Sequence, residues 1–385
     1  MNQRIRHLKY LFIYRITLLT FRLPGKYLSR LRFKYLEQRR FQTSVLIETP
    51  IEIGFAVPPK LENSPKHSAF KIALIVNKQV NRNRVLMEHE LEFAYRRSLE
   101  NLGISLHVFD TFKLSQLHDD GEFLAQQIVD LGISHLFLLG DYVLEEGSYL
   151  NRKKLNDLRQ TLGIVICTIF NDCLISRDGF RILDFWQDVS DVSISCQPHL
   201  LPYFESRNRK LCLWPSYPYP EDAFQSFLSI EKQNSLLVPG SSHRFRKHWA
   251  DFASKSGISV DSQVSDNNNN SFNTYSLTDY FENLGKAKLI FTNGYRNFRE
   301  SEVVARTTEI MLVKSLLLYQ SGSQIDFFFK PYSHYVPVYD LPDLIDKVKY
   351  LLNNPTVADN IICSGRNYLT SQYSSAEFWR QVLHV

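Results

Sequence analysis

The sequence predicts an α/β protein built from two Rossmann-like, doubly wound domains. The chain has 385 residues, which is more than a single hydrophobic core usually serves. Strand-like apolar runs alternate with helix-like segments, and this series begins a second time near residue 235. A proline-rich stretch at 215–220 precedes the second series. We therefore expect domains at 70–225 and 226–385, with residues 1–69 outside both.

The first series has the features of βαβ units with a parallel sheet. Continuous apolar runs are what strands buried on both faces require. Helices are expected before Gly103, from Glu122 to Leu131, and around 150–162. The expected strands are KIALIV (71–76), SLHVFD (105–110), HLFLLGD (135–141), IVICTIFND (164–172), VSISC (192–196) and KLCLWP (210–215).

The second series begins with the apolar run SLLVPG (235–240). A helix that holds Trp249 and Phe252 follows and ends at Gly257. Consecutive asparagines within 266–271 indicate a surface loop. The remaining expected elements are a helix at 277–284, the strand KLIFTN (288–293), a helix opened by Arg306, a buried run at 316–319, the extended piece YVPVYD (335–340) and a helix ending in LLNNP (351–355).

The N-terminal segment differs from the rest in charge. Residues 1–45 hold eleven Lys/Arg and one acid, so they carry +10 of a chain whose net charge is +5, and the remainder is near −5. A mildly acidic body argues against a nucleic-acid partner. The segment has no uncharged run near the ~18–20 residues that a spanning helix needs, and arginines interrupt what would be the apolar core of a signal peptide. We expect a basic, helical, amphipathic arm on an anionic membrane surface; packing on the protein itself or on a partner is the alternative.

The cysteines give no sign of a disulfide framework or a metal site. Their number is odd, and their positions are scattered through mostly apolar runs without zinc-like spacing. Buried thiols of this kind fit a reducing compartment. We therefore expect a cytoplasmic protein, peripheral on the inner face of the membrane through its arm. The cysteines are Cys167, Cys173, Cys196, Cys212 and Cys363.

Two groups of residues follow strands of the second series. Arg306 and Glu309 lie one helical turn apart at the start of a helix. A guanidinium binds phosphate oxygens in a bidentate manner, and a carboxylate accepts two vicinal hydroxyls well. Backbone N–H groups at a helix N-terminus add anion-binding donors. The alternative is an ordinary surface ion pair three residues apart.

The second group is the loop after 235–240. Gly240 allows close approach to the backbone, and Arg244, Arg246 or Lys247 is a candidate to hold a diphosphate. A solvated basic loop is the alternative. No Asp-x-Asp pair occurs in the chain, so we expect protein cations, and no metal, to stabilise a charged leaving group.

The ordered set of segments in the second series resembles a known family. It is formed by VVARTTEIMLVKSLLLY (303–319), the segment from 327 to LLNNP (355), and GRNYLTSQYSSAEFW (365–379). These resemble the GT-B glycosyltransferases of group 1, and among them the CgeB-like type. The resemblance covers 235–380; over 70–220 it is limited to the order of elements and an aspartate after a strand. It implies two Rossmann-like domains that face a cleft.

The resemblance also implies roles for individual residues. Glu309 would bind the ribose of a nucleotide-sugar donor, and Arg306 would face its diphosphate. Where relatives have glycine, this chain has Lys314, which either brings a charge to the donor site or marks a degraded one. Asp141 and Asp172 end two strands of the first series and are candidate bases for an acceptor hydroxyl; capping a following helix is the alternative.

These observations predict a glycosyltransferase of the hexosyltransferase type that needs no cofactor or metal. It would move a sugar from a nucleotide-sugar donor to a glycan, lipid-linked or protein acceptor, in the biosynthesis of a cell-surface polysaccharide or a similar product. The alternative is a catalytically inactive GT-B module that acts as a binding or assembly subunit. A GT-B-like sugar-nucleotide epimerase is a third, weaker reading.

Overall fold

The computed structural model describes most of the chain between residues 70 and 383. All of the described residues belong to one compact unit, residues 63–385. The basic arm, Asp141, Asp172 and Arg244 lie outside the described residues. Between 70 and 383 the stretches left out are 77–89, 118, 120, 140–151, 171–182, 184, 187, 242–245, 266–275, 295–302 and 322–323.

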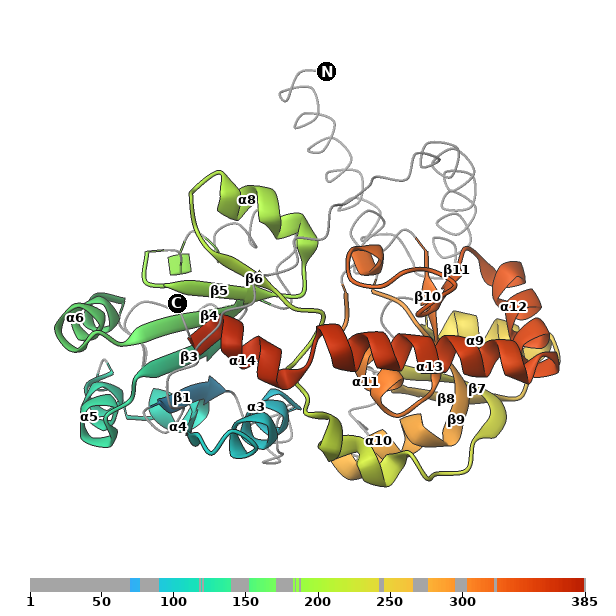
Figure 1. Ribbon diagram of the computed structural model, residues 1–385, viewed down its shortest axis with the longest axis horizontal. Coiled ribbons are helices and arrows are strands. Elements are labelled where there is room, and N and C mark those ends of the chain that lie inside the picture. The colour runs from blue at the N-terminus through green and yellow to red at the C-terminus, as the bar shows by residue number, and fades with distance from the viewer. Residues whose placement is uncertain are drawn as a thin grey trace, which may run out of the picture. The chain divides into compact units, whose positions relative to one another are not determined.

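The first sheet has six parallel strands in the order β2-β1-β3-β4-β5-β6. The expected strands of the first series are all present, because continuous apolar runs are buried between helices on both faces. Figure 1 shows α3, α5 and α6 beside this sheet. The strands are β1 (Lys71–Val76), β2 (Ser105–Asp110), β3 (His135–Leu139), β4 (Val165–Phe170), β5 (Val192–Ser195) and β6 (Leu211–Leu213).

The helices of the first half follow the predicted alternation. The helix expected from Glu122 to Leu131 has those bounds. A left-handed glycine ends it, since Gly132 has φ 63° and its N–H is bonded to the last carbonyls. The helices are α3 (Glu90–Glu100), α4 (Thr111–Ser115), α5 (Glu122–Leu131), α6 (Arg152–Leu162), η2 (Pro198–Leu200), α8 (Leu201–Glu205) and η3 (Glu221–Phe227).

The second sheet has five parallel strands in the order β11-β10-β9-β7-β8. Sequence analysis missed β8 because its polar residues, among them the exposed Asp261 and Ser262, do not form an apolar run. An edge strand tolerates them, since β8 pairs with β7 alone. The strands are β7 (Gln233–Ser241), β8 (Val260–Ser265), β9 (Ala287–Thr292), β10 (Leu316–Gln320) and β11 (Val336–Val338).

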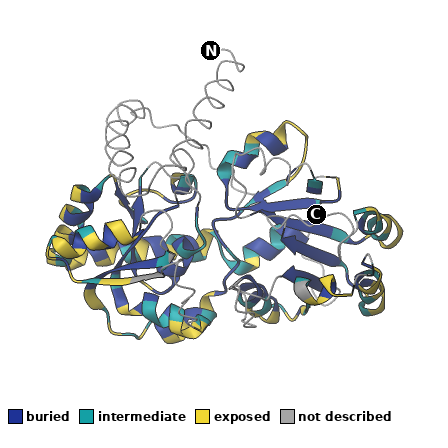
Figure 2. Cartoon of the chain, turned by 180° about the vertical axis from the view of Figure 1, so that it is seen from behind, coloured by how far each residue is buried: buried dark blue, intermediate teal, exposed yellow. Residues whose placement is uncertain are grey.

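The helices of the second half cover this sheet (Figure 2), with exposed residues on their outer sides and buried strands between them. A capping box begins α10, because Ser276 accepts from Asp279 N–H and Asp279 accepts from Ser276 N–H. The helices are α9 (Arg246–Lys255), α10 (Leu277–Lys286), α11 (Arg306–Leu312), η5 (Gln324–Phe327), α12 (Leu341–Asn353), α13 (Pro355–Gln372) and α14 (Ser375–Leu383).

The last helix returns to the first sheet (Figure 1). Trp379 in α14 is 1% exposed, and its Nε1 donates to Ser98 Oγ at 2.8 Å. Its ring meets Tyr95 and Phe137 edge-on, with centroids 5.1 and 5.5 Å apart. Sequence analysis placed 375–383 in the C-terminal domain, and its contacts instead complete the core of the first half. Among the described residues, no helix has the length and apolar character to cross a bilayer.

Candidate functional site

The candidate site lies where the second sheet changes its direction of winding. From β7 the chain passes to β8 on one side and then to β9 on the other, so the switch point lies between β7 and β9. Open α/β sheets bind ligands in the crevice at such a point, beyond the carboxyl ends of the strands. Gly240 lies near the carboxyl end of β7, and Asn293 directly follows β9 and is 1% exposed.

Two arginines converge on the backbone at Gly240. This residue has φ 116°, a conformation that side chains rarely adopt. A Cβ placed there would lie 2.6 Å from Arg246 Nη1 and 2.9 Å from Arg306 Nη1. The absence of a side chain at Gly240 therefore makes room for two guanidinium groups at one place. Two cations held this close favour an anion with several oxygens, which accepts from both.

Each arginine is fixed by a backbone carbonyl at the same edge of the sheet. Arg246 opens α9, is 4% exposed, and donates from Nη2 to Asn293 O at 3.3 Å. Arg306 opens α11, is half-buried, and donates from Nη1 to Pro239 O at 3.3 Å. These bonds hold two side chains from different helices against β7 and β9.

Glu309 is buried beneath this cluster and does not face solvent. It is 1% exposed. Its Oε1 accepts from the hydroxyl of Tyr219 at 2.8 Å, and its Oε2 accepts from the hydroxyl of Tyr280 at 2.7 Å. The Tyr280 hydroxyl in turn accepts from Arg306 Nε at 3.0 Å. A continuous hydrogen-bonded chain thus runs from Tyr219 through Glu309 and Tyr280 to Arg306.

This hydrogen-bonded chain orders the side chain of Arg306. Tyr280 uses its hydroxyl hydrogen toward Glu309 and an oxygen lone pair toward Arg306, so each group has the role that its chemistry allows. A buried polar network in which each member is bonded is rigid. The carboxylate therefore holds Tyr280, and Tyr280 holds the guanidinium of Arg306 toward Gly240.

The structure brings four of the predicted residues into one place, namely Gly240, Arg246, Arg306 and Glu309. It does not bring Lys314 there. Lys314 lies between α11 and β10, is exposed, and has φ 55°. It is near Lys232, whose Nζ donates to Val313 O at 2.8 Å and to Ser315 Oγ at 2.9 Å, the residues on either side of Lys314. Lys232 precedes β7, so Lys314 lies at the amino edge of the sheet, opposite the arginines.

Lys314 therefore adds no charge to the candidate site, and we leave it out of the site. It occupies the left-handed turn that leads from α11 into β10, a conformation that favours glycine. Arg244, Asp141 and Asp172 fall outside the described residues, and their roles stay predictions.

Sequence analysis missed the roles of Tyr280 and Asn293 in this cluster. Asn293 gave a usable signal, since it is a polar residue directly after a buried strand of a parallel sheet. Tyr280 gave none, because it is one tyrosine among several on or near an amphipathic helix. Only the packing of α10 beside α11 shows that its hydroxyl lies between a carboxylate and a guanidinium.

The comparisons with known proteins concern the same part of the chain. Residues 234–384 match the model of a family described as glycosyl transferase-like. This segment includes Gly240, Arg246, Arg306 and Glu309. A search of curated proteins found no match.

Solved structures resemble nearly the whole described chain. An alpha-glucosyltransferase in complex with UDP-glucose and DNA containing an abasic site has a TM-score of 0.57 at 12% identity, over 81% of this chain and 98% of that one. Sucrose-phosphate synthase from Thermosynechococcus elongatus has a TM-score of 0.55 at 11% identity, over 82% of this chain and 99% of that one. Alr3699/HepE from Anabaena, in complex with UDP and glucose, has a TM-score of 0.52 at 10% identity, over 82% of this chain and 98% of that one.

At these identities the likeness shows the fold. It confirms the predicted class, an α/β protein with two Rossmann-like domains of the GT-B type. The family match and the glycosyltransferases among the structural neighbours together support a transferase enzyme.

Proposed function

We propose that this protein transfers a sugar from a nucleotide-sugar donor, and that the donor binds at the switch point of the second sheet. The observation that carries the proposal is the convergence of Arg246 and Arg306 on Gly240. It lies inside the segment that matches the glycosyl transferase-like family. Two of the structural neighbours described above were solved with UDP-glucose or with UDP and glucose. UDP-sugars are therefore the first donors to test.

The two arginines suit the diphosphate of such a donor. When the sugar leaves, negative charge develops on the phosphate oxygen that held it. Guanidinium groups already fixed by carbonyl oxygens stabilise that charge without reorganisation. We propose that these protein cations stabilise the leaving diphosphate without a metal ion.

Glu309 has two possible roles in donor binding: it binds the ribose directly, or it positions Arg306. The geometry favours the second, indirect role. The resemblance implies that it binds ribose hydroxyls, but both of its oxygens accept from tyrosines within the protein. Glu309 is also only 1% exposed, so a ribose reaches it only after Tyr219 or Tyr280 moves aside. We propose that Glu309 acts first as a positioning residue, which orders Arg306 through Tyr280.

The acceptor side of the proposal rests on sequence alone. A glycan, a lipid-linked sugar or a protein acceptor is expected, with Asp141 or Asp172 as the base for its hydroxyl. The basic segment 1–45 suits an anionic membrane surface on the cytoplasmic side, where a lipid-linked acceptor would be within reach. We keep polysaccharide biosynthesis and the CgeB-like type as parts of this proposal.

A second candidate function has one observation in its favour. A carboxylate that is buried and bonded to two tyrosines also fits a purely structural role, as in a module that binds donors or partners without turnover. Two arginines at a switch point retain the ability to bind an anion in either case. The two functions therefore differ in turnover and not in nucleotide binding.

The test has two stages. Thermal shift and calorimetry with UDP-, GDP-, ADP- and CMP-sugars should find at least one nucleotide that binds and stabilises the protein. If no nucleotide binds, the donor site is refuted. Release of the free nucleotide from the donor that binds, with a membrane extract as the source of acceptor, then separates the enzyme from the inactive module. Arg97→Ala, an exposed change on α3, is the control for nonspecific loss of charge.

A further inference from the structure

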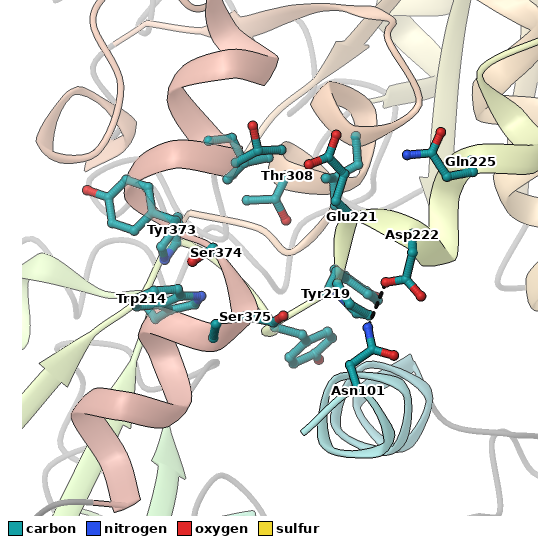
Figure 3. A pocket seen from close by; sticks show the side chains of 17 residues that line it. Asn101, Trp214, Tyr219, Glu221, Asp222, Gln225, Thr308, Tyr373, Ser374 and Ser375 are labelled. Carbon is teal, nitrogen blue, oxygen red and sulfur yellow. Dashed lines mark hydrogen bonds between the residues drawn. The ribbon is translucent and has the colours of Figure 1, made fainter. Parts of the chain in front are cut away.

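A cavity of about 500 Å³ lies away from the arginine cluster. Four parts of the chain surround it, as Figure 3 shows: the end of α3 at Asn101, the segment 214–225 that joins the two halves, α11 at Thr308, and the junction of α13 and α14. Pockets for small ligands have volumes of about 300–1,000 Å³. The cavity is therefore large enough for a ligand of the size of a mono- or disaccharide.

One wall of the cavity is aromatic. Trp214 and Tyr373 meet edge-on with centroids 5.3 Å apart, and Tyr217 and Tyr219 meet in the same way at 5.9 Å. Trp214 and Tyr219 are 2% and 5% exposed, so the aromatic surface open to the cavity belongs mainly to the half-buried Tyr217 and Tyr373. Such a surface suits the apolar C–H faces of a sugar ring.

The cavity is also lined by hydrogen-bonding groups, some of which are bonded within the protein. Asn101 Nδ2 donates to Asp222 Oδ1 at 2.8 Å (Figure 3). Arg366, which is 8% exposed, donates from Nη2 to Glu221 Oε1 at 2.5 Å. Each carboxylate has further lone pairs that accept hydroxyl groups, and Gln225 adds an amide that both donates and accepts.

The charge of the lining selects the class of ligand. Among the described residues that line the cavity, there is no lysine, arginine or histidine. A phosphate or a nucleotide would therefore face carboxylates without a cation. Arg366 neutralises Glu221, and the amide of Asn101 occupies one oxygen of Asp222, so a single negative charge is left for a cation. The groups that remain match a neutral molecule with several hydroxyls.

Two lining residues connect the cavity to the arginine cluster. Tyr219 lines the cavity and donates to Glu309 Oε1 at 2.8 Å. Thr308, which precedes Glu309 on α11, lines it as well. A ligand that moves the Tyr219 ring thus acts on the carboxylate that orders Tyr280 and Arg306.

We propose that this cavity binds a small neutral polyhydroxylated ligand of mono- or disaccharide size, separately from the donor, and that its occupation changes donor affinity through Tyr219. The binding part is independent of the proposed function. The coupling part rests on it.

Binding is tested with the full chain and no nucleotide. Glucose, galactose, maltose and sucrose are the probes, with putrescine as a cation and glucose 6-phosphate as an anion, and saturation-transfer NMR and calorimetry as the readouts. At least one neutral sugar should bind with a Kd below about 10 mM. Gln225→Ala should weaken it about five- to tenfold, the loss expected for a hydrogen bond.

Ser226→Ala is the matched control, because Ser226 lies next to Gln225 on η3 and does not line the cavity. It should bind like the natural protein. The assignment is overturned if no neutral sugar binds, if the two variants bind equally well, or if putrescine or glucose 6-phosphate binds in preference to the sugars.

The coupling is tested by measuring the Kd of UDP with and without a saturating concentration of the sugar that binds. We expect a change of about threefold or more, within the range of ordinary coupling energies, and its loss in Tyr219→Phe. An unchanged Kd refutes the coupling. Sugar binding by a protein that binds no nucleotide supports the cavity assignment and refutes both the coupling and the proposed function, so the two failures are distinguishable.

Discussion

The end of β5 in the first sheet and the ends of β7 and β9 in the second sheet lie beside different buried polar groups. Beside β7 and β9 two of the buried groups are charged, since Arg246 and Glu309 are 4% and 1% exposed. At the end of β5 in the first sheet they are neutral, since Ser195 and Gln197 are both 0% exposed. Buried charges are expensive unless paired. The two buried or half-buried arginines therefore make this edge of the second sheet the better candidate to bind an anion, as proposed above.

The neutral groups that follow β5 contact the second half of the chain. Cys196 Sγ and Gln197 Nε2 both donate to Val303 O, at 3.2 and 3.4 Å. His199 N–H donates to Gln324 Oε1 at 2.8 Å. Val303 lies three residues before Arg306, so these bonds support the start of α11 without adding charge to it.

Loss of Arg306 is the largest expected effect and tests the comparison directly. Arg306→Ala should weaken nucleotide binding about 10- to 100-fold, because hydrogen bonds to charged groups contribute about 1.5–3 kcal/mol. His199→Ala at the edge of the first sheet should change the Kd by less than about twofold. Calorimetry with the nucleotide that binds best measures both. Similar losses in the two variants would contradict the division between the edges.

Gly240→Ala should have the second-largest effect on nucleotide binding. The added Cβ meets Arg246 Nη1 at 2.6 Å and Arg306 Nη1 at 2.9 Å, at a backbone φ of 116°. We expect unfolding to become easier by about 2–4 kcal/mol and nucleotide affinity to fall about tenfold as the guanidinium groups are displaced. Gly257→Ala is the matched control, with φ 81° and no atom within 4 Å of the new Cβ.

Denaturant unfolding and calorimetry separate the two glycines. Gly257→Ala should show backbone strain of about 1–2 kcal/mol and an unchanged Kd. A normal Kd in Gly240→Ala would show that the arginines do not meet the ligand at this point.

Tyr280→Phe distinguishes the two roles of Glu309. If Glu309 positions Arg306, the lost hydroxyl breaks the chain, and both Tyr280→Phe and Glu309→Gln should weaken nucleotide binding about three- to tenfold. If Glu309 binds ribose directly, Tyr280→Phe frees Oε2 and should leave affinity unchanged or improve it, while Glu309→Gln still weakens it. 2′-Deoxynucleotides distinguish the two roles further. If Glu309 bonds the ribose hydroxyls directly, Glu309→Gln should cost less affinity for a 2′-deoxynucleotide than for the ribonucleotide. If Glu309 only positions Arg306, the loss should be the same for both.

Lys314→Gly has the smallest expected effect. Relief of the left-handed φ of 55° should raise the free energy of unfolding by about 0.5–1 kcal/mol. The Kd for nucleotide should not change, because Lys314 lies at the amino edge of the second sheet. A change in affinity would restore Lys314 to the donor site that the family resemblance implied.

The sequence predicted the regular part of the fold well. Both series of apolar strands, and the helix Glu122–Leu131 to the residue, follow from local pattern. It missed β8, whose polar edge has no such pattern, and it could not assign α14, because the contact of Trp379 with Tyr95 joins residues far apart in the chain.

The residues of the candidate site could be predicted from the sequence, but the hydrogen bonds between them could not. Gly240, Arg246, Arg306 and Glu309 follow from residue type and position after strands. The sequence does not show which atoms meet, and the burial of Glu309 between Tyr219 and Tyr280 depends on the packing of three separate segments. The same holds for Lys314, since its distance from the site follows from the direction of α11.

The return of α14 to the first sheet has a consequence for synthesis on the ribosome. Trp379 emerges after the whole of the second half, yet it packs on Tyr95 and Phe137, which emerge long before it. Until then the nascent first half exposes aromatic surface that the finished protein covers. Such surface is where chaperones bind and aggregation begins, so the first half is expected to need protection until α14 has been synthesised.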